Sequence, residues 1–106
     1  MKKKAMLYGV ETGELDNFRD EMEKILDVSF SAHESEYHGG EYFRLAEMDL
    51  NVILQENFME DDGEVTEAEF PEQELLIYIS GDEIRVCEVS DVLRKNNFSL
   101  LKSSTY

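Results

Sequence analysis

The sequence predicts an α+β fold, a two-layer sandwich in which two helices cover a largely antiparallel sheet. Three observations predict it. Apolar residues recur every three or four positions over residues 15–26, they alternate with polar residues from residue 28 onward, and Gly39-Gly40 then breaks the alternation as a hairpin turn would. The expected order is β-α-β-β-β-β-α-β, in a single compact domain spanning residues 1–106.

The first strand is expected at residues 4–10, KAMLYGV, a short apolar run that ends at Glu-Thr-Gly. A helix should follow, with Thr12 or Gly13 as its cap and with Glu14 and Asp16 near the positive end of its dipole. Its apolar face, expected in the core, comprises Leu15, Phe18, Met22, Ile25 and Leu26.

Three strands should form a meander in the middle of the chain. Residues 29–37 and 41–48 are expected to pair around Gly39-Gly40, with the alternation beginning at Val28, and residues 50–58 should form the next strand. An acidic loop at 59–74 precedes an apolar strand at 75–79. We expect that strand and the last one, at 98–104, to lie centrally in the sheet.

Residues 82–95 fit two structures. The run IRVCEV has strand propensity, whereas Val86, Val89 and Leu93 have helical spacing. Helix is favoured over a strand with a short helix, because Asp82 can cap its start and Asn96-Asn97 can end it.

Negative charge is concentrated in one part of the chain. The net charge is −15, and residues 45–84 contain 13 Asp or Glu and no Lys or Arg, which leaves −2 for the remainder. Such a field disfavours nucleic acid and anionic membranes as direct partners and favours a basic protein. The alternative is that the charge serves only solubility.

No catalytic or metal-binding pattern accompanies the charge. His33 and His38 lack a third ligand nearby, and a calcium loop through Gly63 would place Phe58 where an oxygen ligand is needed. Cys87 is expected to be a buried structural thiol. We therefore expect a protein that is not an enzyme and needs no cofactor or metal.

A cytoplasmic location is expected. The single cysteine excludes an intrachain disulfide, and the chain turns acidic too soon after Met1 for a signal peptide. It also contains no apolar run of membrane length.

Several short blocks carry a resemblance over about two thirds of the chain, from Tyr37 to Leu101. YHGGEYFR, LQENF, an acid-rich loop closing in FPEQELLIYISG, and FSLLK together resemble small acidic immunity proteins of bacterial toxin systems, including those of contact-dependent growth inhibition. The resemblance implies a small cytosolic protein that binds and neutralises a cognate toxin domain. A nuclease-type toxin would suit the charge, because nucleases present cationic surfaces to phosphates.

The expected function is thus that of an immunity protein, and an acidic adaptor or regulatory binding module is the alternative. Partner contacts are expected from the acidic loop rather than the first helix, with Phe70 as an exposed aromatic anchor that adds to charge steering. Phe58 and Met59 are weaker anchor candidates. The expected partner-binding residues are Tyr37, Tyr42, Glu60, Asp61, Asp62, Glu64, Glu67, Glu69, Phe70 and Glu72.

Overall fold

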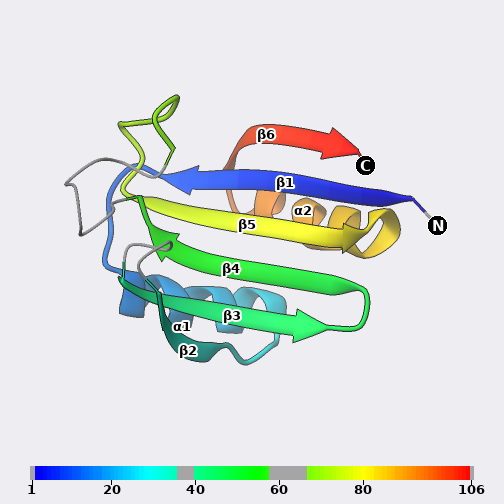
Figure 1. The fold of residues 1–106 in the computed structure, drawn as a ribbon, viewed down its shortest axis with the longest axis horizontal. Coiled ribbons are helices and arrows are strands. Elements are labelled where there is room, and N and C mark those ends of the chain that lie inside the picture. The colour runs from blue at the N-terminus through cyan, green and yellow to red at the C-terminus, as the bar shows by residue number, and fades with distance from the viewer. Residues whose placement is uncertain (1, 36–39, 58–66, 106) are drawn as a thin grey trace.

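The computed structural model describes residues 2–35, 40–57 and 67–105. Within them, a sheet forms one layer and both helices pack behind it, as Figure 1 shows. The predicted α+β class and element order are confirmed. The elements are β1 (Lys3–Val10), α1 (Leu15–Leu26), β2 (Ser31–Ser35), β3 (Gly40–Glu47), β4 (Leu50–Glu56), β5 (Leu75–Asp82), α2 (Glu83–Lys95) and β6 (Ser99–Thr105).

The described strands form one sheet of six in the order β2-β3-β4-β5-β1-β6. Every neighbouring pair is antiparallel, so β5 and β6 run parallel to each other on either side of β1, joined by α2. The predicted β2–β3 pairing is present, with His33 opposite Tyr42, while the turn residues 36–39 lie outside the described part of the chain. The first strand of the chain is therefore inserted between the last two.

Position in the sheet corrects one expectation. The strand at 75–79 is central, but β6 lies at the edge, and its side chains are mostly exposed. Its apolar pair Leu100-Leu101 predicted burial, yet β1 takes the central place beside β5 because it pairs along its whole length with that strand. Strand order depends on such long-range pairing, which local hydrophobicity does not encode.

The start of β2 also differs from the expectation. The alternation begins at Val28, but the strand begins at Ser31. Glu23 accounts for the difference, because its main-chain carbonyl accepts a hydrogen bond from the Val28 N–H at 3.2 Å and its Oε2 accepts one from the Phe30 N–H at 2.8 Å. These contacts hold residues 28–30 against the end of α1.

Helix α1 buries the predicted face at Leu15, Phe18 and Met22, whereas Ile25 and Leu26 are only partly buried. The predicted cap is wrong: Glu14 occupies the N-cap position and makes no side-chain capping bond. The helix ends where Asp27 adopts the left-handed conformation, with φ of 54°.

Residues 83–95 form a helix, as favoured from their spacing, because Val86, Val89 and Leu93 all face the core. Asp82 stands at the N-cap position but makes no side-chain capping bond, so its predicted capping bond is absent. At the other end, Asn96 donates from Nδ2 to the Val92 carbonyl at 2.8 Å and ends the helix. Cys87 is partly buried, rather than buried as expected.

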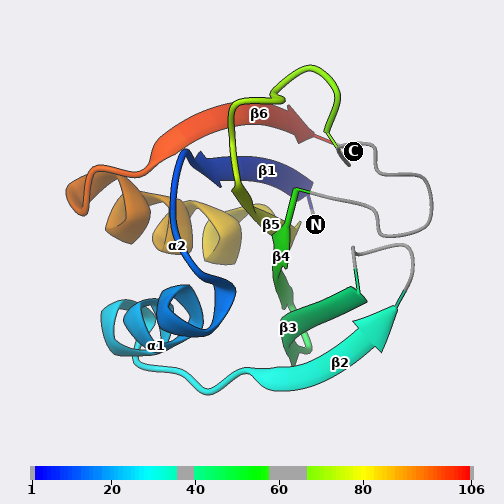
Figure 2. The ribbon, with the colours of Figure 1, turned by 90° about the vertical axis from the view of Figure 1, so that its left-hand side faces the viewer.

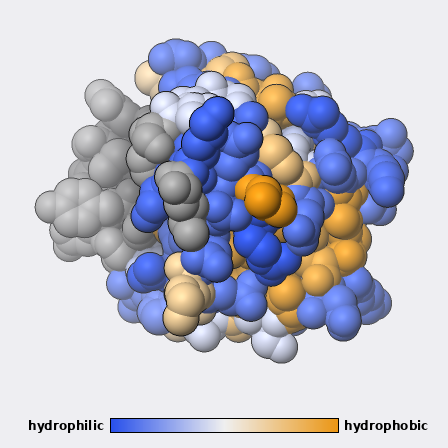
Figure 3. All heavy atoms as spheres, turned by 90° about the vertical axis from the view of Figure 1, so that its right-hand side faces the viewer, coloured by the Kyte–Doolittle hydropathy of each residue, from blue (hydrophilic) through white to orange (hydrophobic). Residues whose placement is uncertain are grey.

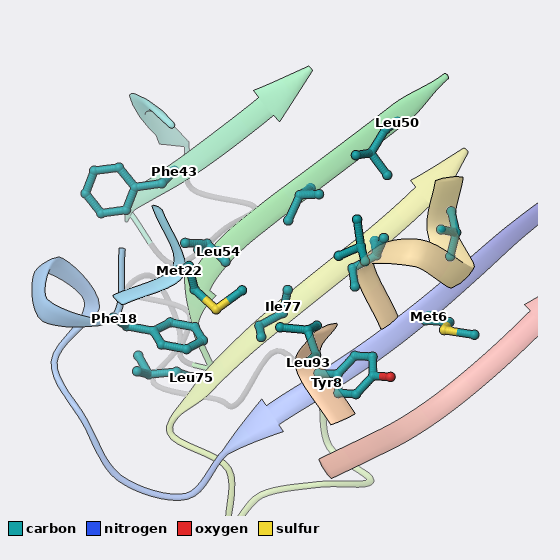
Figure 4. Packing of buried hydrophobic residues seen from close by; sticks show 14 of the residues in the cluster. Met6, Tyr8, Phe18, Met22, Phe43, Leu50, Leu54, Leu75, Ile77 and Leu93 are labelled. Carbon is teal, nitrogen blue, oxygen red and sulfur yellow. The ribbon is translucent and has the colours of Figure 1, made fainter. Parts of the chain in front are cut away.

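The core lies between the sheet and the two helices. Figure 4 shows side chains from α1, α2 and the central strands meeting there, among them Tyr8, Met22 and Leu93, which have no exposed surface. The Tyr8 hydroxyl forms a hydrogen bond with the Ser90 hydroxyl, so its buried polar group has a partner within this layer. This core fixes the sheet on which the candidate surface is built.

Candidate partner-binding surface

The sheet has two ends that differ in chemistry. At the loop end, β4 finishes at Glu56 opposite Leu75, the first residue of β5. At the opposite end, the β3–β4 turn lies beside the junction of β5 and α2, where Leu50 pairs with Gly81. Figure 1 shows both ends of the sheet. The described acidic residues of 45–84 are divided between these two ends.

Acidic residues at the opposite end lie beside basic ones. Arg85 Nη2 is 3.2 Å from Glu47 Oε1, and Lys3 is directly across from Asp82 in the β1–β5 register. Lys3, Glu47, Asp49 and Asp82 also line one shallow hollow. Positive charges from outside the acidic run therefore offset this part of it.

Among the described acidic residues of 45–84, three exposed carboxylates at the loop end have no ion-pair partner, compared with one, Asp49, at the opposite end. Glu56, Glu72 and Glu74 are exposed and form no ion pair with a described residue. The ion pairs seen in the described part of this end come from Lys102, whose Nζ lies 3.3 Å from Glu69 Oε1 and 3.6 Å from Glu67 Oε2. Two further cations, Arg94 and Lys95, end α2 in the helix layer. Among the described residues, exposed carboxylates without an ion-pair partner are therefore more numerous at the loop end, which is the end of the molecule that faces the viewer in Figure 2.

Residues 67–74 cross the face of the sheet that the helices leave uncovered. Gly9 on that face lies under Gln73, since a Cβ built on Gly9 would stand 2.6 Å from Gln73 Oε1. Gln73 is itself buried, and Leu7 and Leu76 on the same face are buried although they lie outside the main core. The segment is thus packed onto the sheet.

Asn57 holds this segment in place. Its Nδ2 donates to the carbonyls of Phe70 and Gln73, both at 2.9 Å, and its Oδ1 accepts from the Glu67 N–H at 2.8 Å. The Asn57 N–H also donates to the Glu74 carbonyl at 2.8 Å. Sequence reasoning gave Asn57 no role, and an Asn directly after a strand and before a long loop was the available signal.

Glu67 is engaged within the protein. The Tyr78 hydroxyl donates to Glu67 Oε1 at 2.6 Å, while Lys102 approaches the other carboxylate oxygen. Burial, and then the hydrogen bond to Glu67 and its charge, raise the pKa of Tyr78 above its ordinary value. Glu67 is therefore a partly buried residue that ties the loop to the sheet, unlike the exposed Glu69 and Glu72.

Phe70 differs from the exposed anchor that was expected. It is partly buried, its N–H donates to the Glu67 carbonyl at 3.0 Å, and its carbonyl accepts from both Asn57 and the Gln73 N–H. Lys102 Nζ lies 5.8 Å from the ring centroid, within range of a cation–π contact. The Phe70 ring thus already contacts Lys102 within the protein, because the surrounding turn positions Phe70 against the sheet.

Tyr42 is brought to the same end of the molecule. It lies opposite Gln55, the residue before Glu56, and its ring stacks on His33 with centroids 5.4 Å apart. His33 is exposed on β2, as expected for the solvent side of a strand. The expected contact residues Tyr37, Glu60, Asp61, Asp62 and Glu64, and the weaker candidates Phe58 and Met59, lie outside the described residues.

An apolar groove between the two helices was not anticipated. It has a volume of about 170 Å³, with Arg85 and Glu88 at its rim, and its apolar walls are Ile25, Leu26, Val28, Leu45, Leu50, Val89 and Val92. Met48 and Ile84, at the opposite end of the sheet, are also exposed, with exposed fractions of 99% and 70%. Figure 3, which faces the opposite end, shows apolar side chains at the surface on the helix side. Leu26 was expected in the core and Val28 at the start of a strand, so the partial exposure of both residues was missed.

Within residues 2–35, 40–57 and 67–105, no group of three or more His, Cys, Asp or Glu is arranged to hold a metal ion. None of the helices described has the length and apolar character needed to cross a membrane.

What the loop end presents is a set of fixed and exposed carboxylates, which suits contact with a cationic surface. In comparisons with known proteins, no family model, no curated protein and no solved structure matches this chain.

Proposed function

We propose that this chain is an immunity protein that binds a cognate basic toxin domain, of the nuclease type, and neutralises it in the cytoplasm. It acts by occupying the toxin's cationic surface and carries out no catalysis of its own. The observation that carries the proposal is the uncompensated charge of the loop end, where Glu56, Glu72 and Glu74 are exposed without a described ion-pair partner. The resemblance of the sequence blocks to small acidic immunity proteins supports the same conclusion.

Electrostatic attraction suits this role. Complementary fields raise association rates to about 10⁸ to 10⁹ M⁻¹s⁻¹ at low salt, which lets an inhibitor capture its target before damage accumulates. Exposed ion pairs contribute only about 0 to 1 kcal/mol each, so apolar contacts must also hold the complex. Phe70 and Tyr42 stand beside the acidic surface and are suited to supply them.

Co-expression tests the proposal. An immunity gene should lie directly downstream of its toxin gene, so the chain is produced in bacteria together with the toxic domain that such a neighbour encodes. Growth is compared with cells that carry the toxin and an empty vector. Growth should be restored, and the two purified proteins should form a complex whose association slows as salt is raised. Undiminished toxicity in cells that contain the folded protein would overturn the proposal.

An acidic adaptor is the second candidate, and the apolar groove between α1 and α2 favours it. An adaptor would seat an apolar side chain of its client among Ile25, Val89 and Val92. Val92→Glu discriminates the two functions, because it places a charge in the groove of the helix layer and leaves the loop-end carboxylates on the sheet unchanged. An immunity protein that uses the loop end should still protect cells with this change, whereas an adaptor should lose its client.

A further inference from the structure

The Asn57 side chain uses both of its donors and its acceptor on one short segment. It is 4% exposed, and its three partners are the main-chain groups of Glu67, Phe70 and Gln73. No other side chain of the same size supplies two N–H donors and a carbonyl acceptor in this arrangement. The contacts therefore depend on the identity of Asn57 and on its place at the end of β4.

These contacts fix the geometry of the acidic segment. The Phe70 N–H donates to the Glu67 carbonyl at 3.0 Å, and the Gln73 N–H donates to the Phe70 carbonyl at 3.2 Å, so two successive turns are both tied to Asn57. Within these turns Gln73 is buried, while Glu69 and Glu72 are exposed. The direction in which the two carboxylates project is therefore set by a residue more than ten positions away in the chain.

We infer that Asn57 is a positioning residue, which holds Glu69 and Glu72 in their binding arrangement before a partner arrives. The inference rests on the proposed function for the identity of the partner, a protein with a basic surface. A segment that is already ordered does not lose conformational freedom on binding, so preorganisation raises affinity without adding a contact. Asn57 itself is buried and would touch no partner.

Asn57→Asp is the informative substitution, because it keeps the size of the side chain and replaces its two donors with an acceptor. The new carboxylate would face the carbonyls of Phe70 and Gln73, which repel it. Asn51→Asp is the matched control. It makes the same change on β4, the strand that ends just before Asn57, where Asn51 accepts from Arg44 Nε at 2.8 Å and a carboxylate can still accept.

Amide hydrogen exchange measured by NMR tests the positioning itself. In the unchanged protein, the amides of Glu67, Phe70 and Gln73 should exchange together and far more slowly than in a free peptide. In Asn57→Asp they should exchange at least about tenfold faster, while the amide of Ile77 in the central strand and all amides of Asn51→Asp change much less. Unprotected Glu67 in the unchanged protein, unaltered exchange in Asn57→Asp, or equal acceleration at Ile77 would each overturn the inference. The first of these outcomes is measured on the unchanged protein, so it does not depend on whether a variant folds.

Affinity for the toxin domain supplies a second readout whose sign is decisive. Both variants add one negative charge, so charge attraction alone would make both bind a basic partner slightly more tightly. Positioning predicts the reverse for Asn57→Asp, a dissociation constant about tenfold larger, with Asn51→Asp equal to or tighter than the unchanged protein. Tighter binding by Asn57→Asp would overturn the inference. If the unchanged protein bound no toxin, the proposed function would fail, while the exchange experiment would still decide whether Asn57 positions the segment.

Discussion

Among the described residues, the two ends of the sheet carry four and five acidic residues from one stretch of sequence, yet they differ in the cations that lie beside them. The four are Glu47, Asp49, Asp82 and Glu83, and the five are Glu56, Glu67, Glu69, Glu72 and Glu74. At the opposite end, Glu47 pairs with Arg85 and Asp82 faces Lys3. At the loop end, Lys102 pairs with Glu67 and Glu69, while the exposed Glu56, Glu72 and Glu74 have no described ion-pair partner. A run of like charge in the sequence therefore does not by itself form a uniformly charged surface, because residues distant in the chain decide which part of the run is neutralised.

The two ends are also held together differently. The opposite end depends on close main-chain contacts, in which the Asp49 carbonyl accepts a hydrogen bond from the Asp82 N–H at 2.9 Å beside Gly81. The loop end depends on side chains, chiefly Asn57 and Tyr78, that reach across to residues 67–74. Substitutions at the opposite end should therefore mainly lower the stability of the protein. Substitutions at the loop end should mainly weaken its recognition of a partner.

The largest effect is expected from Gly81→Ala. Gly81 has φ of 138°, and a Cβ there would overlap the Asp49 carbonyl oxygen, so the main chain would have to move. We expect a loss of about 3 kcal/mol in the free energy of unfolding, measured by urea denaturation. Gly13→Ala is the comparison near the loop end: Gly13 also has a positive φ, of 155°, but its nearest neighbour would be the flexible Leu75 Cδ1 at 3.2 Å, and a loss of about 1 kcal/mol is expected. Equal losses would contradict the difference in packing.

Charge reversal should separate the two ends by function. Glu72→Lys combined with Glu74→Lys should slow association with the toxin domain by about tenfold or more at low salt and weaken the dependence on salt. Asp49→Lys combined with Glu83→Lys changes the net charge equally at the opposite end and should have much less effect. Stopped-flow or surface-based kinetics at several salt concentrations measure both. Matching rates for the two double variants would mean that total charge, and not its position, guides the encounter.

Phe70→Ala should act on the lifetime of the complex. If the exposed part of the ring enters the interface, dissociation should accelerate about tenfold while association changes little, because lost apolar contacts affect mainly the off-rate. Because Phe70 is partly buried, the unfolding free energy of the variant is measured alongside the kinetics. An unchanged off-rate in a folded variant would leave the loop end with a steering role only.

The smallest effect is expected from Tyr78→Phe, which removes the hydrogen bond to Glu67. Because the folded protein raises the pKa of Tyr78, the stability gained from its neutral form is complete below the ordinary tyrosine value of about 10 and is lost as pH rises above it. Urea unfolding at neutral pH should show a loss of about 1 kcal/mol. The same measurement above pH of about 10 should show a smaller difference from the unchanged protein. A constant difference across this range would contradict the role of the Tyr78 proton.

Much of the fold follows from local patterns. The spacing of Leu15, Phe18 and Met22 sets the first helix, and Val86, Val89 and Leu93 set the second against a competing strand propensity. Both predictions are confirmed because a helix is stabilised mainly by burying one face, and the period of that face is written in consecutive residues.

Order across the sheet and the form of the candidate surface came from tertiary structure. Nothing local distinguishes the edge strand β6 from the central β1, since their places depend on pairing between residues near opposite termini. For the same reason the sequence located the acidic run but not its neutralisation by Lys3 and Arg85 at one end. It also gave no role to Asn57, whose three partners lie ten to sixteen residues further along the chain. Hydrogen bonds and ion pairs act over a few ångströms in space, so only the folded chain decides which residues they join.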